Sequence, residues 1–134
     1  MISWEQKLIL GVPEMDKEHK ELVEKTNDML LALKSGNSTE EVVRHMKFLA
    51  EYVIKHFNSE EKLQMRVNYP DMAAHKKVHA EFKNTVTHLI EDINKNGLTT
   101  SKKIQVSQMT VDWLLKHIGV EDKKLATYIL QNKN

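Results

Sequence analysis

Four long stretches of the chain carry apolar residues at every third or fourth position, and short polar breaks separate them. This spacing places the apolar side chains on one face of an α-helix, and strand-like alternation does not occur. Gly36, Pro70, Gly97 and Gly119 lie in or beside the breaks. Short connections between long amphipathic helices make successive helices antiparallel. The sequence therefore predicts an all-α fold, an up-down-up-down four-helix bundle.

We expect residues 1–134 to form one domain, because a chain of this length can bury a core without disulfides. Ser38 and Glu41 have the spacing of a capping box, and Asp71 and Thr99 are candidate caps of later helices. The expected elements are an N-terminal arm at about 1–15, helices at about 17–35, 39–65, 71–95 and 102–118, and a short C-terminal helix at about 122–131.

Composition excludes several kinds of site and partner. The chain has no cysteine, which rules out disulfides, thiolate-bound zinc and iron–sulfur clusters. Its net charge is +1 and its lysines and acids are interleaved, so we expect no nucleic-acid surface. No apolar run approaches the roughly 20 residues that span a bilayer, and residues 1–14 do not have the pattern of a signal peptide. We expect a cytoplasmic monomer without a membrane span.

Histidine interrupts every apolar stripe, and the second stripe also contains a glutamate. In two antiparallel helices, residues at equal distances from the turn lie at the same height. The midpoints of His19 and His56, of Glu60 and His79, and of His79 and His117 all fall on predicted turns. These side chains are therefore expected to lie in one layer across the bundle.

The helical angles agree with these heights. His56 and Glu60, like His75 and His79, are four residues apart and share a face, with about 6 Å of rise. A helix end at Gly119 would let Asp122 turn inward, whereas a continuous α-helix would aim it about 140° away from the preceding histidine. Seven potential metal ligands are expected to converge: His19, His56, Glu60, His75, His79, His117 and Asp122.

Three further polar residues are expected to lie outside this layer. His45 is about 16 Å along its helix from His56. His88 is roughly half a turn out of phase with His79 and should face solvent. Glu61 is rotated by about 100° from the preceding glutamate and should point away from the centre.

Seven buried polar side chains would cost several kcal/mol or more without partners. A hydrogen-bonded network would lack acceptors for five imidazoles, and a nucleophilic site would need a serine or cysteine in the layer. Nitrogen and oxygen ligands suit iron, manganese, copper or zinc, and seven are too many for one tetrahedral zinc. Two octahedral ions with bridging carboxylates and one bridging oxygen would keep a single open position, which O2 fits.

The spacing of these residues resembles the hemerythrin family, closest to the single-domain bacterial hemerythrins, over nearly the whole chain. The matching motifs are His19, His56-Phe57-x-x-Glu60-Glu61, Tyr69-Pro70 with His75-x-x-x-His79, and Trp113-Leu114-x-x-His117-Ile118-x-x-x-Asp122. The family often has Ile-Asp-x-Gln-His in the first helix, where this chain has Met15-Asp16-Lys17-Glu18-His19.

The resemblance implies two non-heme iron ions per chain, joined by an oxo or hydroxo bridge, with O2 as a reversible ligand. The implied iron ligands are His75, His79 and His117 for one iron, His19 and His56 for the O2-binding iron, and Glu60 and Asp122 as bridges. The side chains expected to line the O2 pocket are Phe57, Trp113 and Ile118. We expect a binding protein for oxygen carriage, storage or delivery, and not an enzyme.

Two alternatives stay open. A di-iron oxidase or peroxidase is disfavoured, because ferritin-like oxidases use Glu-x-x-His and more carboxylates than histidines. This chain has no Glu-x-x-His, and five of its seven candidate ligands are histidines. An O2 or redox sensor would need to act through a separate partner protein.

Overall fold

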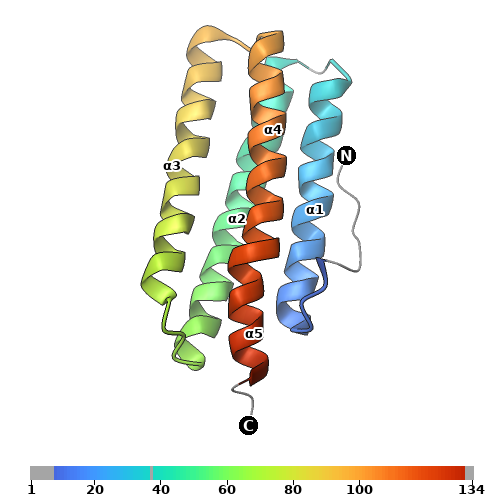
Figure 1. Ribbon diagram of the computed structural model, residues 1–134. Coiled ribbons are helices and arrows are strands. Elements are labelled where there is room, and N and C mark those ends of the chain that lie inside the picture. Colours follow the sequence, from blue (N-terminus) through green and yellow to red (C-terminus); the bar gives the residue numbers. More distant parts are fainter. Residues whose placement is uncertain (1–7, 37, 132–134) are drawn as a thin grey trace.

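The structure is a computed structural model that describes residues 8–36 and 38–131. Its helices are α1 (Pro13–Lys34), α2 (Thr39–Arg66), α3 (Met72–Asn96), α4 (Thr100–Lys116) and α5 (Lys123–Gln131), with a π-helix, η2 (His117–Asp122), between α4 and α5. Helices α1 to α4 run side by side in alternating directions (Figure 1), and α1 contacts α2 and α4 while α2 contacts α3. The predicted all-α, up-down-up-down bundle is confirmed.

Side-chain caps begin two of the helices. The Ser38 hydroxyl accepts a hydrogen bond from the backbone N–H of Glu41 at 3.2 Å, and the Thr99 hydroxyl accepts one from Lys102 at 3.1 Å. Asp71 is the N-cap residue of α3, but its side chain makes no capping hydrogen bond. Caps of this kind satisfy backbone N–H groups that have no partner inside the helix.

Helix α1 begins at Pro13, earlier than the expected start at about residue 17. Proline suits the first position of a helix because its φ is already helical and it lacks an N–H. The carboxylate of Asp16 then accepts the backbone N–H groups of Leu10 and Gly11 at 2.7 and 3.1 Å, which ties the arm to the first turn. The arm is thus shorter than expected, and its residues 1–7 lie outside the described residues.

The prediction of a helix end at Gly119 is wrong. Helix α4, η2 and α5 follow one another without a break and form one continuous column at the front of Figure 1. Gly119 is exposed within η2, and its backbone φ lies outside the left-handed region that glycine favours. A widened helical turn therefore replaces the expected break.

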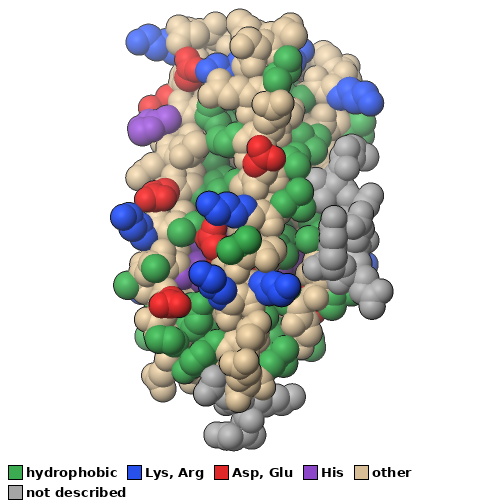
Figure 2. Space-filling view, viewed as in Figure 1, with side chains coloured by type: hydrophobic (Ala, Val, Ile, Leu, Met, Phe, Trp, Pro, Cys, Tyr) green, Lys and Arg blue, Asp and Glu red, His purple; other side chains and the backbone are tan. Residues whose placement is uncertain are grey.

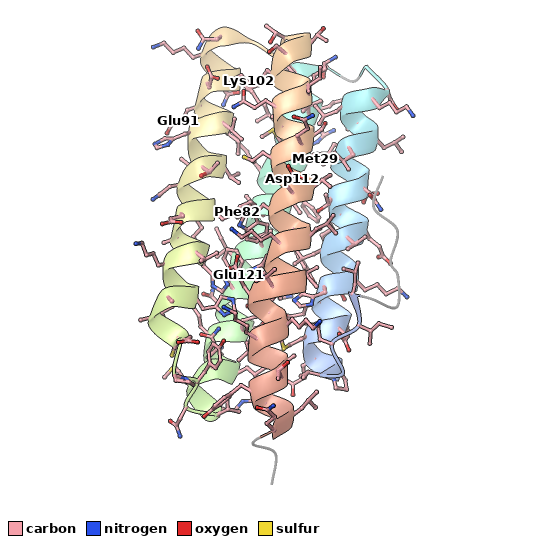
Figure 3. All side chains as sticks on the ribbon, viewed as in Figure 1. Met29, Phe82, Glu91, Lys102, Asp112 and Glu121 are labelled. Atoms are coloured by element: carbon pink, nitrogen blue, oxygen red, sulfur yellow. The ribbon has the colours of Figure 1, made fainter. Side chains whose placement is uncertain are left out.

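The apolar core has two parts with the polar layer between them. The larger cluster contains Met29 and Phe82, both labelled in Figure 3, and fills most of the bundle. The smaller cluster closes the end where α5 lies and consists of Val12, Met15, Leu63, Tyr69, Leu125 and Ala126. Along each helix the candidate ligands fall between residues of these two clusters or beside the larger one, so apolar packing encloses them on both sides.

The face shown in Figure 2 carries Lys or Arg and Asp or Glu side chains interspersed with hydrophobic ones. The electric potentials of opposite charges that alternate in this way largely cancel at a distance, and salt screens what remains. Within residues 8–36 and 38–131, no helix combines the length and the apolarity that crossing a membrane requires.

Two leucines of α1 provide a matched test of this packing. Leu22 is fully buried in the larger cluster, whereas Leu31 is 53% exposed. We expect Leu22→Ala to lower the free energy of unfolding by about 2–5 kcal/mol because it leaves a cavity, and Leu31→Ala to change it by about 0.5 kcal/mol or less. Urea denaturation at the same metal loading measures both, and equal losses would contradict this core assignment.

Candidate metal centre

Three helices and η2 bring all seven predicted side chains into one buried layer. They are His19 from α1, His56 and Glu60 from α2, His75 and His79 from α3, and His117 and Asp122 from η2. Each is 5% exposed or less. Of the three residues expected outside the layer, His45 is half-buried and His88 is exposed. Glu61 is also half-buried.

The two carboxylates lie in the middle of the layer. Asp122 Oδ2 is 2.7 Å from Nε2 of His19 and 2.9 Å from Nε2 of His117. Glu60 Oε1 contacts Nε2 of His56 and lies 3.2 Å from Nε2 of His117. One oxygen of each carboxylate therefore faces histidines of α1, α2 and η2.

The other oxygen of each carboxylate faces α3. Glu60 Oε2 lies 3.1 Å from Nε2 of His75 and 3.4 Å from Nε2 of His79. Asp122 Oδ1 lies 3.1 Å from Nε2 of His75. Both carboxylates thus span the layer with separate oxygens, which is the arrangement that a bridge between two metal ions needs.

The donor atoms form two groups in which all of them lie within 4.8 Å of one another. One group is His19, His56, Glu60 and Asp122, and the other is Glu60, His75, His79 and His117. Glu60 belongs to both. His117 is grouped with the α3 histidines, although its carboxylate contacts are to the oxygens on the His19 side. The assignment of each residue to a particular iron stays a prediction.

Many of these buried atoms lie close to one another, but the angles between them do not form hydrogen bonds. They include Nε2 of His19, His56, His75 and His79, Oε2 of Glu60 and both oxygens of Asp122. A buried polar atom without a partner costs about 1–3 kcal/mol. Metal ions coordinated by these nitrogens and oxygens would satisfy them together, so the residues fit a two-metal centre.

The ring nitrogens that face away from the centre contact a second set of side chains. His56 Nδ1–H donates to Glu18 Oε1 at 2.9 Å, and His75 Nδ1 lies 2.7 Å from the Gln64 amide. With Nε2 of His75 on a metal, its Nδ1 carries the hydrogen. Turning the Gln64 amide places Oε1, which otherwise has no partner, where it accepts that hydrogen.

Two further glutamates lie at longer distances from outer nitrogens. Glu61 Oε1 is 3.7 Å from Nδ1 of His79, the nitrogen that faces away from the centre, so Glu61 contacts a proposed ligand from outside the two donor groups. Glu121, in the lower half of Figure 3, has Oε2 3.6 Å from Nδ1 of His117. Acceptors at the outer nitrogen orient an imidazole and increase its basicity toward a metal.

The sequence reasoning missed four outer residues: Glu18, Glu61, Gln64 and Glu121. A usable signal existed for two of them, because Gln64 follows Glu60 and Glu121 follows His117 by four residues on one helical face. The partner of Glu18 is on another helix, so only the packing of α1 against α2 reveals it.

The π-helix η2 explains how His117 and Asp122 point to the same centre. Five residues of α-helix turn a side chain about 140° away from its starting direction. In a π-helix the hydrogen bonds join residues five apart, so the residue at i+5 lies close to directly above residue i. The sequence reached the correct inward direction of Asp122 by the wrong route, a helix end.

Aromatic side chains cover the α3 and α4 side of the layer. Phe57 stacks on the His79 ring with centroids 3.6 Å apart, and Trp113 stacks on His117 at 4.7 Å. Phe82 extends the stack against Trp113 at 3.7 Å. Trp113 thus contacts a histidine of the α3 group rather than His19 or His56. Its predicted role in an O2 pocket, like those of Phe57 and Ile118, stays a prediction.

Two cavities reach the layer, one between α1 and α2 and the other beside α3, η2 and α5. One, of about 350 Å³, lies between α1 and α2 and is lined by His56 and Glu60 at its inner end. The other, of about 340 Å³, is lined by His75 and by Tyr69, Asp71 and Glu121. Both cavities have charged side chains at their rims.

Burial and the attraction between opposite charges shift the pKa values of the layer in opposite directions. Burial alone would raise the pKa of Glu60, yet the neighbouring His56 and His117 hold this pKa well below its usual value. Burial alone would lower the pKa of His75, but Asp122 and Glu60 raise it to about 9. The same carboxylates raise the pKa of His19, His56 and His117, whereas burial prevails at His79 and lowers its pKa.

These shifts predict opposite pH responses for the metal-free and the metal-loaded chain. Without metal, the stabilisation from His75 is fully present below pH 6.5 and is lost as the pH rises through about 9. A metal requires neutral imidazoles, so it removes this dependence. We expect the melting temperature of the stripped chain to fall by several degrees between pH 6.5 and 9, and that of the loaded chain to stay level or rise. A stripped chain that becomes more stable over this range would contradict the raised pKa of His75.

Comparisons with known proteins agree with this geometry. Residues 10–129 match the family described as Hemerythrin HHE cation binding domain. A bacteriohemerythrin of Stenotrophomonas maltophilia is 26% identical over 100% of this chain and 85% of its own length. A hemerythrin-like protein of Naegleria gruberi is 30% identical over 91% of this chain and 88% of its own length.

The solved structures point the same way. A crystal structure of wild-type hemerythrin superposes with a TM-score of 0.84 at 25% identity, covering 96% of this chain and 98% of that one. The hemerythrin domain binds a non-heme di-iron centre, and the two buried donor groups suit it. This chain belongs to the hemerythrin family.

Proposed function

We propose that this chain binds O2 reversibly at a di-iron centre held by the seven buried side chains of the layer. Membership of the hemerythrin family supports an O2-binding di-iron protein in general terms. The observation that carries the specific proposal is that each carboxylate presents separate oxygens to histidines of different helices. The proposed division is His75, His79 and His117 on one iron and His19 and His56 on the other, with Glu60 and Asp122 as bridges.

The ligand count leaves room for one small molecule. Two octahedral ions held by the five histidine nitrogens and the two carboxylates, with one bridging oxygen from solvent, would have all but one of their positions filled. The open position would belong to the ion held by His19 and His56, because that ion would have fewer histidines. A bound iron pair would supply the electrons that O2 takes up on binding and returns on release.

The chain's own residues would hold and shield this pair. Glu18 and Gln64 fix the ring orientation of His56 and His75 through their outer nitrogens. Phe57 and Ile118, both fully buried, keep water out of the neighbouring core. Limiting water and protons favours return of O2 unchanged, so the proposed role is binding rather than catalysis.

The direct test is a cycle of oxygenation. Reduced, iron-loaded protein should change from nearly colourless to red-violet on exposure to O2, and removal of O2 should restore the first spectrum over repeated cycles. Absorption spectra under alternating argon and air measure this. Irreversible bleaching, or peroxide that accumulates with each cycle, would contradict reversible binding.

The ligand assignment has a matched pair of variants on α3. His79→Ala removes a buried imidazole of the layer, whereas His88→Ala removes an exposed one. We expect the His88 variant to retain two irons per chain and the His79 variant to bind iron more weakly, by about tenfold or more. Iron analysis after dialysis against a chelator measures both. Iron loss from the His88 variant alone would refute the assignment.

One observation favours a second candidate, slow oxidase or peroxidase activity. The cavity between α1 and α2 has charged and polar walls and reaches His56, so protons have a route toward the proposed open iron. An O2 or redox sensor that acts through a partner protein is the third alternative. A cytoplasmic location and a monomeric state stay predictions from the sequence.

A further inference from the structure

The seven proposed ligands are at most 5% exposed, so an iron ion must pass through the bundle wall to reach them. The cavity between α1 and α2 is a passage to the layer that ends on both a histidine and a bridging carboxylate, His56 and Glu60. The cavity beside α3 reaches His75 but is not lined by Glu60 or Asp122.

The mouth of the α1/α2 cavity carries a row of carboxylates. Glu14, Glu18 and Glu21 line it from α1, at positions i, i+4 and i+7 that share one helical face. Lys17 and Lys55 are the basic side chains of the lining, and Arg66 pairs with Glu14 at 3.1 Å at the exposed rim. With Glu60 at the inner end, acids outnumber bases in this cavity, and such an imbalance attracts cations and speeds their arrival.

One acid of the mouth, Glu18, connects the open rim to the buried layer. Glu18 is 25% exposed and bonds to Nδ1 of His56 at 2.9 Å, so it lies between the open rim and the buried layer. At the inner end, His56 and Glu60 are each 1% exposed, and Nε2 of His56 has no hydrogen-bond partner. This unpartnered nitrogen, on a residue that lines the cavity, is a second indication that the cavity leads a cation to its ligands.

We propose that the cavity between α1 and α2 is the port through which ferrous iron reaches the centre. Glu14 and Glu21 attract the ion to the rim, and Glu18 passes it to Glu60 and His56. Carboxylate oxygens suit this task because they bind divalent ions while the ions retain part of their water. The proposal rests on the di-iron centre and not on the role of O2, which is uncharged and indifferent to these carboxylates.

The test is the rate at which the full-length, metal-stripped chain takes up ferrous iron under argon. Circular dichroism first verifies that each stripped variant is helical. We expect Glu14→Gln with Glu21→Gln to slow uptake by about tenfold at low ionic strength, with the difference shrinking in high salt. The final iron content and the oxygenation spectrum should match those of the unaltered chain, which separates a failure of the port from a failure of the proposed function.

Matched controls change the same charge elsewhere. Glu81→Gln with Glu91→Gln alters two exposed acids of α3, and Figure 3 shows Glu91 on the outer side of that helix. This pair should leave the uptake rate within about twofold of the unaltered chain. Equal slowing by both pairs would overturn the proposal, because the effect would then follow net charge alone.

Two further variants keep the test decisive if the mouth acids prove necessary for folding. Lys17 and Lys55 are exposed, so Lys17→Gln with Lys55→Gln should fold and should speed uptake severalfold. No acceleration would overturn the proposal. Asp71→Asn at the other cavity should have no effect, and slowing there without slowing at the mouth would place the port beside α3 instead.

Discussion

The bundle encloses a layer of five imidazoles and two carboxylates, and the need to satisfy these groups constrains everything around them. In the metal-free chain they share protons, which is why the carboxylate pKa values are low and most of the histidine pKa values are raised. Several of their nitrogens and oxygens are nevertheless buried without a well-formed hydrogen bond. Metal ions would satisfy the same atoms without protons, so the layer is suited to release protons when it binds metal.

This constraint shapes the helix that provides the last two ligands. His117 and Asp122 can face one centre from a continuous helix only if the turn between them is widened, and η2 provides that turn. The aromatic rings of Phe57 and Trp113 then stack on His79 and His117 and fix their planes. The directions of these ligands therefore depend both on the backbone geometry of η2 and on the packing of the aromatic side chains.

The outer contacts and the two cavities give the layer an asymmetry. Glu18, a carboxylate where the family often has glutamine, bonds to His56 and also lines a charged passage. Gln64, a neutral amide, bonds to His75, which lines the second cavity together with Tyr69 and Asp71. A cavity thus reaches the centre on each side, but only the one between α1 and α2 is lined by a carboxylate of the layer.

The sequence by itself determined the bundle and the height of the layer, because helical periodicity and distances from the turns depend only on residue spacing. It identified His19, His56 and His79 as neighbours for that reason. The tertiary structure decided what spacing does not encode. The π-helical turn at His117, the contact of Glu18 with a histidine on another helix and the two cavities all arise from how helix surfaces pack, and packing depends on the three-dimensional arrangement of side chains far apart in the chain.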